Sequence, residues 1–135
     1  MTREKAAAEG EWVAVCPVGD IVPNTGVCCL IAGQQVALFR LDTDALYAIG
    51  NYDPFSKANV LSRGIVGDRA GHPKVASPIY KQSFSLETGV CMDDDAVSLP
   101  TYAVRVRDGI VEVSTSVTEA LPSGNKDLLA ESHTA

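Results

Sequence analysis

Short apolar runs separated by turn residues dominate the first part of the chain. The runs at 12–16, 27–32, 36–41 and 46–49 are rich in β-branched and aromatic residues, which favour strands. A short turn at 33–35 joins the second run to the third and predicts a hairpin. Because both arms are almost wholly apolar, we expect an inner strand pair covered on both faces. Four strands with short connections predict an antiparallel sheet.

The clearest alternation of apolar and polar residues lies later in the chain. It occupies 102–107 and 110–113 and flanks an Asp-Gly pair, a strong hairpin signal because both central residues can adopt positive φ. We expect Val104 and Val106 to face the core, and the arginines that alternate with them to face solvent.

The middle of the chain has no such period. Between 56 and 74 the composition shifts to Gly, Ser, Arg and Asp, and an unstructured connection of this length is normally functional or lid-like. Short strand candidates follow at 75–76, 83–85 and 90–92. We therefore expect a small β subdomain over 51–91, inserted into the larger sheet.

Length, composition and charge limit the class of protein. A chain of 135 residues is one domain by size. Its net charge of -6 disfavours binding to nucleic acids and to anionic membranes. No apolar run approaches the ~20 residues of a membrane span. The first ten residues carry charges of both signs without an apolar segment, so we expect no secretory signal and a cytoplasmic protein.

The ends of the chain are polar. The sequence predicts a flexible leader at 1–11, a folded body at 12–113 and a mobile polar tail at 114–135, with one or two helical turns at most at 125–131.

Two turn segments, Asn-Tyr-Asp-Pro-Phe-Ser at 51–56 and Ala-Ser-Pro-Ile-Tyr-Lys at 76–81, each contain a proline. They resemble the two loops of Rieske-type domains, where Cys-x-His and Cys-x-x-His pairs hold a two-iron, two-sulfur cluster. The run Ser-Phe-Ser-Leu-Glu-Thr-Gly at 83–89 is similar to the Phe-Asp-x-x-Thr-Gly run of that family. The resemblance implies an all-β Rieske-type fold, with antiparallel sheets in a sandwich or partial barrel and a small subdomain that carries both loops.

None of the cluster ligands of that family is present. The resemblance places Asp53 and Phe55 at the ligand positions of the first loop, and Ser77 and Tyr80 at those of the second. Phenylalanine has no lone pair, and the serine and tyrosine hydroxyls are not ionised at neutral pH. The remaining carboxylate suits hard cations rather than an iron–sulfur core. The sequence therefore predicts the loop frame without a metal site, and no catalytic residue in this chain.

Four runs, at 36–40, 47–55, 60–68 and 75–84, resemble in order the small subunit of bacterial assimilatory NAD(P)H-dependent nitrite reductase. The resemblance covers about 12–113. It implies that a large partner subunit carries FAD, siroheme and an iron–sulfur cluster and reduces nitrite to ammonium. This chain would then have no cofactor of its own.

With the ligands replaced, the loop ends offer aromatic and aliphatic side chains, which often anchor protein interfaces. The candidate residues for docking on the large subunit are Tyr52, Phe55, Ile79, Tyr80, Lys81 and Arg63. Alternatively, the aromatic residues fill the core that the cluster would vacate. Arg63, Arg69, Lys74 and Lys81 either form a locally positive rim or are ordinary solvated charges.

Two other functions stay open. The domain could be a cluster-free interaction module of another oxidoreductase, such as a ring-hydroxylating oxygenase system, or a thiol redox sensor that uses Cys28, Cys29 or Cys91. The cysteines form no Cys-x-x-Cys motif, and adjacent residues of a strand point to opposite faces. We therefore expect all four, Cys16 included, to be buried free thiols.

Overall fold

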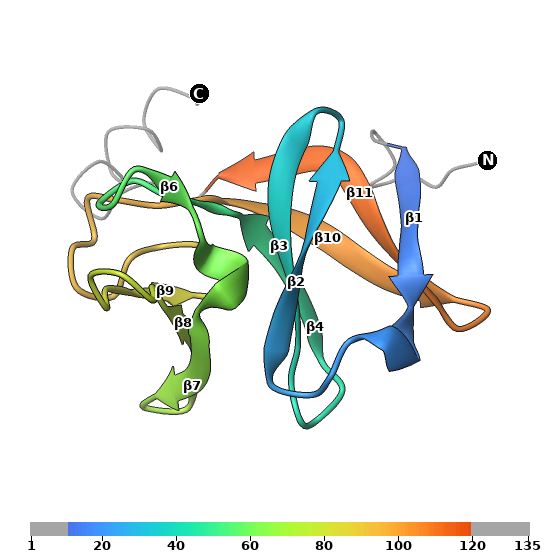
Figure 1. Cartoon of the computed structure of the whole chain (residues 1–135), viewed down its shortest axis with the longest axis horizontal. Coiled ribbons are helices and arrows are strands. Elements are labelled where there is room, and N and C mark those ends of the chain that lie inside the picture. The colour runs from blue at the N-terminus through green and yellow to red at the C-terminus, as the bar shows by residue number, and fades with distance from the viewer. Residues whose placement is uncertain (1–10, 120–135) are drawn as a thin grey trace, which may run out of the picture.

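The structure, a computed structural model, describes residues 11–119 and is all β apart from two short 3-10 helices (Figure 1). Six strands form the main antiparallel sheet, in the order β1-β11-β10-β4-β3-β2, and the sheet curls into a half-barrel. Its strands are β1 (Trp12–Pro17), β2 (Thr25–Ile31), β3 (Gln34–Arg40), β4 (Leu46–Gly50), β10 (Pro100–Arg107) and β11 (Ile110–Glu119). The all-β prediction is confirmed.

A smaller subdomain is inserted between β4 and β10 and lies beyond one end of the main sheet (Figure 1). A two-stranded hairpin and a three-stranded antiparallel sheet make up this part. Its elements are β5 (Tyr52–Asp53), β6 (Ala58–Asn59), η2 (Leu61–Arg63), β7 (Ile65–Arg69), β8 (His72–Ala76) and β9 (Ser83–Ser85). The other 3-10 helix, η1 (Val18–Asp20), follows β1.

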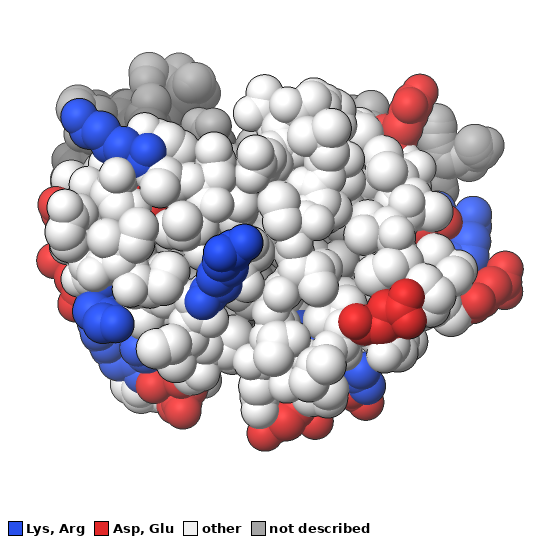
Figure 2. All heavy atoms as spheres, in the orientation of Figure 1, with Lys and Arg blue, Asp and Glu red and all other residues white. Residues whose placement is uncertain are grey.

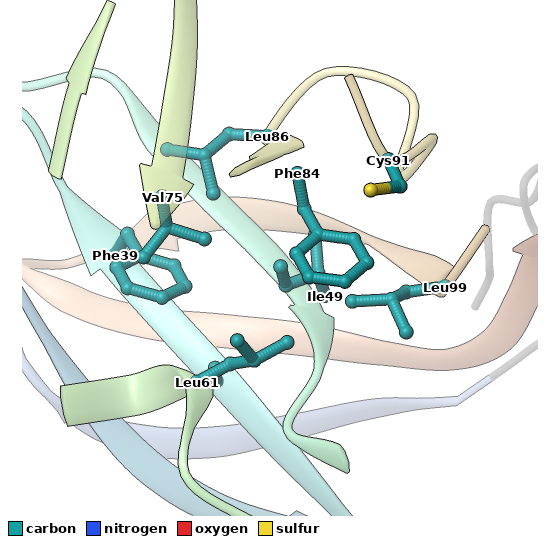
Figure 3. Packing of buried hydrophobic residues seen from close by; sticks show 9 residues of the cluster. Phe39, Ile49, Leu61, Val75, Phe84, Leu86, Cys91 and Leu99 are labelled. Carbon is teal, nitrogen blue, oxygen red and sulfur yellow. The ribbon is translucent and has the colours of Figure 1, made fainter. Parts of the chain in front are cut away.

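Two buried clusters hold the fold together. One fills the curl of the main sheet and includes Val36 and Leu38 of β3. The other lies between the sheet and the subdomain and includes Ala37 and Phe39, which point to the opposite face of the same strand. Figure 3 shows this second cluster, in which residues of the sheet pack against Leu61, Val75, Phe84, Leu86 and Cys91 of the inserted segment. Strand β3 is therefore covered on both faces, as predicted.

The prediction that both faces of the strand are covered is wrong for β2. This strand forms an edge of the six-stranded sheet, and Leu30 is 66% exposed. The β2–β3 turn itself has the geometry expected of a tight hairpin, with φ of 50° at Ala32 and 83° at Gly33. An apolar run thus marked the strand correctly but gave no information on its place in the sheet.

The last predicted hairpin is confirmed, with its Asp-Gly turn between β10 and β11. Val104 packs against the core as expected, but Val106 is 48% exposed because it lies near the turn, beyond the core. Arg105 is only half exposed. Its Nε donates to Glu112 at 2.6 Å, and its guanidinium lies 4.1 Å from the centroid of the Trp12 ring.

The prediction of an unstructured connection at 56–74 is also wrong, because this segment contains β6, η2, β7 and most of β8. These elements are two to five residues long, too short for a hydrophobic period to be recognised. They also include Gly67 and Pro73, residue types that are uncommon in strands. Strand β11 continues to Glu119, beyond the expected end of the body. The helical turns considered at 125–131 lie outside the described residues. No helix within 11–119 is long and apolar enough to cross a membrane.

Candidate functional site

The first loop spans 53–57 and is organised by the buried side chain of Asp53. Its Oδ1 accepts a hydrogen bond from the backbone N–H of Phe55 at 2.9 Å, and its Oδ2 accepts one from Ser56 Oγ at 2.9 Å. The Asp53 carbonyl accepts from the backbone N–H of Lys57 at 2.7 Å. Aspartate commonly forms such turns, because its side chain satisfies the N–H two residues later. The loop closes with Lys57 at a φ of 61°.

The second loop, 77–81, repeats this construction. Buried Ser77 accepts a hydrogen bond at Oγ from the backbone N–H of Ile79, at 3.2 Å. Its carbonyl accepts from the backbone N–H of Lys81 at 3.1 Å, and Lys81 has a φ of 70°. Both loops thus read as a residue with a side-chain oxygen, then proline, two further residues, and a lysine in the left-handed region.

One hydrogen bond joins the loops, and we call it the loop latch. Ser77 Oγ donates to Asp53 Oδ2 at 2.6 Å, between two side chains that are both 0% exposed. Burial raises the pKa of Asp53, but the hydrogen bonds from Ser77, Phe55 and Ser56 together lower it more. The pKa therefore lies below its ordinary value, and the carboxylate is ionised at neutral pH. A short hydrogen bond to a buried carboxylate is among the stronger kinds.

The four positions that the resemblance assigns to cluster ligands do not fit an iron–sulfur cluster. The oxygens of Asp53 and Ser77 bond to each other, and half-buried Phe55 packs against Phe84 with ring centroids 6.2 Å apart. Tyr80 is 60% exposed. Such clusters need thiolate or imidazole ligands, which none of these side chains supplies. Within residues 11–119, no three histidine, cysteine or acidic side chains are gathered as a metal site would require.

Asn51 attaches the first loop to the main sheet, a role that the sequence analysis missed. This buried side chain accepts from the backbone N–H of Ser62 at 2.7 Å and donates to Gln35 Oε1 at 3.1 Å. It therefore links β5, η2 and the end of the β2–β3 hairpin. The position of an asparagine directly before the loop could have suggested this role, because its short amide side chain can form hydrogen bonds with nearby backbone groups.

Of the predicted docking residues, Tyr52 is 46%, Ile79 46% and Tyr80 60% exposed. We call these three residues the loop tip. Phe55 instead lies against the core, as the alternative interpretation expected for the aromatic residues. A cleft of about 450 Å³ opens beside Tyr52, between the β2–β3 turn and the segment that leads into β10.

The four cations considered for a positive rim fall into two groups. Arg69 lies 3.3 Å from Asp93, and Lys74 donates to Ser83 Oγ at 2.8 Å, so both support the base of the second loop. Arg63 and Lys81 are exposed. No acidic side chain within 11–119 lies at ion-pair distance from these two residues.

The cysteines differ from the expectation of uniform burial. Cys91 is buried and Cys16 is half-buried, whereas Cys28 is exposed on the edge strand β2. Burial, followed by the neighbouring Cys28 and Cys16, raises the pKa of Cys29 to about 11. Burial likewise raises the pKa of Cys91. Neither Cys29 nor Cys91 is therefore a reactive thiolate at neutral pH, which disfavours a thiol sensor built on these two residues.

Comparison with known proteins gives a consistent result. The family described as Rieske-like [2Fe-2S] domain matches residues 11–114. The NADH nitrite reductase small subunit of Salmonella typhimurium is 47% identical over 104 residues, which covers 76% of this chain and 96% of that protein. A solved structure described as an NADH-dependent nitrite reductase small subunit from Mycobacterium tuberculosis is 50% identical with a TM-score of 0.76, and covers 78% of this chain and 95% of its own.

A third match is to part of a much longer protein. The NAD(P)H nitrite reductase large subunit of Klebsiella oxytoca is 38% identical over 131 residues, which covers 92% of this chain and 12% of that protein.

Proposed function

This chain belongs to the Rieske-like domain family and, within it, to the small subunits of NADH-dependent nitrite reductase, and on that premise we propose that it is a cluster-free docking subunit for the large catalytic subunit. The large subunit carries FAD, siroheme and an iron–sulfur cluster and reduces nitrite to ammonium in the cytoplasm. This chain contributes a binding surface, and no electron passes through it.

The observation that carries the proposal is the loop latch. Asp53 and Ser77 stand where a Rieske domain has two of its ligands, and their side chains are engaged with each other at 2.6 Å. The hydrogen bond therefore joins the two loops directly, and the packing of Phe55 against Phe84 also anchors the first loop. A rigid pair of loops without redox chemistry is suited to recognition, because little conformational freedom is lost when it binds.

The loop tip has the composition of an interface anchor. Tyr52 of β5 and Ile79 and Tyr80 of the second loop are exposed, and aromatic side chains provide much of the energy of protein interfaces. A side chain of the partner can insert into the cleft beside Tyr52. The surface thus has both protruding groups and a recess, as complementary interfaces require.

The match to the Klebsiella oxytoca large subunit supports the same arrangement. A segment of that polypeptide resembles nearly this whole chain, so a domain of this kind occurs covalently joined to a large subunit. Covalent joining keeps two binding surfaces at high effective concentration. A small subunit of the kind matched in Salmonella typhimurium, which this chain covers to 96% of its length, must instead hold its partner through surface contacts.

Replacement of Ile79 and Tyr80 by serine tests the docking function. We expect the double variant to fold normally and to lose roughly tenfold or more in affinity for the large subunit, since buried aromatic anchors dominate interface energy. Size-exclusion chromatography and nitrite-dependent NADH oxidation would measure the loss. Val106→Ser is the matched control, because Val106 is 48% exposed near the end of β10. Figure 1 shows the turn between β10 and β11 on the side of the molecule away from the subdomain. Equal binding by both variants would refute the proposal.

A further inference from the structure

We propose that Lys57 and Lys81 form a pair of cationic contacts for carboxylates on the large subunit, an inference that rests on the docking function above. The two residues end the two loops at equivalent positions, four residues after Asp53 and Ser77. The sequence analysis included Lys81 among the docking residues but not Lys57. Their equivalence becomes evident only when the hydrogen bonds of the two loops are compared.

The backbone conformation of both lysines is unusual. Lys57 has a φ of 61° and Lys81 a φ of 70°, in the left-handed region that side chains with a Cβ atom adopt at a cost. Glycine occupies this region readily and is the residue usually found where a turn needs it. Both loops nevertheless carry lysine there. Other turns of the described chain also place non-glycine residues at positive φ, Ala32 and Ala70 among them, so what distinguishes the two lysines is their equivalent position at the end of the two joined loops.

Both ammonium groups are also available to a partner. The two side chains are exposed, and within residues 11–119 no acidic group lies at ion-pair distance from either. Arg40 and Arg105, by contrast, are already engaged, Arg40 with Asp44 at 2.8 Å and Arg105 with Glu112 at 2.6 Å. Arg63, like the two lysines, has no acidic partner within 11–119. The lysines of the loops thus keep their charge for an external group.

The loop latch brings the two lysines to one end of the molecule. The backbone N–H of each lysine bonds to the carbonyl of Asp53 or Ser77, and the side chains of these two residues are joined at 2.6 Å. The lysines therefore share the surface that carries the loop tip. Figure 2 shows basic side chains over the subdomain at the left, with acidic side chains at its left and lower edges and further acidic side chains along the lower and right edges of the molecule.

The two lysines without acidic partners indicate the kind of partner surface. The protein as a whole has a net charge of -6 and repels polyanions such as nucleic acids, so an extended phosphate backbone is a poor ligand. Two separate cations beside exposed tyrosines instead fit aspartate or glutamate side chains at the rim of a protein interface. Charges at a rim mainly accelerate association and make it sensitive to salt.

Glycine substitution offers a clean test. Lys57→Gly and Lys81→Gly remove the charge and relieve the strained φ, so the double variant is expected to keep or raise its thermal midpoint. We expect its affinity for the purified large subunit to fall roughly tenfold at 50 mM NaCl, mostly through a slower association rate, and to depend less on salt than that of the unmodified protein. Surface plasmon resonance at 50 and 300 mM NaCl would measure both effects.

Arg107→Glu is the charge control, because Arg107 is exposed at the opposite end of the fold and its substitution changes net charge by the same two units as the double glycine variant. Its affinity should stay within twofold of the unmodified protein. If the double glycine variant binds with unchanged affinity and salt dependence, the lysine contacts are refuted, and the docking function stands as long as Ile79→Ser/Tyr80→Ser still weakens binding. If the unmodified protein does not bind the large subunit, both proposals fail.

Discussion

Asp53→Asn is the substitution that most directly tests the loop latch. The side chain of Asp53 is fully buried and accepts hydrogen bonds from Phe55 N–H, Ser56 Oγ and Ser77 Oγ at 2.9, 2.9 and 2.6 Å. Hydrogen bonds to a charged group contribute about 1.5–3 kcal/mol each. Asparagine keeps one acceptor oxygen, but its NH2 group would replace the oxygen that accepts from the serine hydroxyls in the unmodified protein, and an NH2 group cannot accept these hydrogen bonds. We expect a loss of about 2 kcal/mol in unfolding free energy, because one of the bonds is replaced by a weaker neutral one.

The pH dependence of stability should change with it. The pKa of Asp53 is lowered in the folded protein, so its stabilisation is present above the pKa of the unfolded chain, about 3.9. That stabilisation is lost as the pH falls through the lower folded value. The unmodified protein should therefore lose stability from roughly pH 5 downwards, whereas Asp53→Asn should lose less over the same interval. Asp93, whose pKa is also lowered, contributes to the part that remains.

Urea unfolding at pH 7 and at pH 3, followed by circular dichroism, provides the measurement. Trp12 is the single tryptophan of the chain and supplies an independent fluorescence signal from the main sheet. Asp42→Asn is the control, because Asp42 is an exposed carboxylate and its substitution should change stability by less than about 0.5 kcal/mol. The reasoning fails if Asp53→Asn costs no more than the control at pH 7, or if it leaves the acid sensitivity unchanged.

Three further substitutions or treatments test other parts of the structure. Gly89→Ala should lower the free energy of unfolding, measured by thermal unfolding, by about 3 kcal/mol or more, because φ is +81° and the new methyl group would meet a backbone carbonyl just before β10. Gly71→Ala is the control: its φ is +85° but the space around it is open, so it measures the cost of the backbone conformation without the clash. Phe84→Ala should cost about 3–5 kcal/mol in urea unfolding, since the ring is fully buried between sheet and subdomain, and a cost below 1 kcal/mol would contradict this packing. Under native alkylation at pH 7.5, mass spectrometry should find Cys28 labelled at least about tenfold faster than Cys29, whose pKa is raised to about 11; equal rates would contradict the burial of Cys29.

The main sheet could be predicted from the sequence because its signals are local. Apolar runs marked β3 and β4, and the Asp-Gly turn marked the last hairpin. Whether a given residue of a strand is buried or exposed was harder to predict from the sequence. Leu30 and Leu38 stand in similar runs, yet Leu38 is 0% and Leu30 66% exposed. Which strand forms the edge of a sheet depends on pairing between distant segments, and hydrophobic period does not encode this directly.

The candidate site shows the same division. The ligand positions Asp53, Phe55, Ser77 and Tyr80 could be found by resemblance, and their chemistry excluded a cluster without any structure. The hydrogen bond between Asp53 and Ser77 spans 24 positions, and no local pattern predicts it. The inward packing of Phe55 was expected only as an alternative, because it depends on the position of Phe84, 29 residues later on β9. The repeated loop construction that ends at the lysines was present in the sequence and was overlooked.

The loop latch also explains how the two loops hold their shape without a metal. In a Rieske domain the cluster joins the loops through two irons, and removal of the ligands removes that link. A short hydrogen bond between Ser77 and Asp53, supported on the sheet side by Asn51, replaces it with groups that need no cofactor. The oxygens of this pair supply neither thiolate nor imidazole for an iron–sulfur cluster. Under the docking proposal, the exposed tyrosines and lysines of this region form the recognition surface, and its function is tested in the complex with the large subunit.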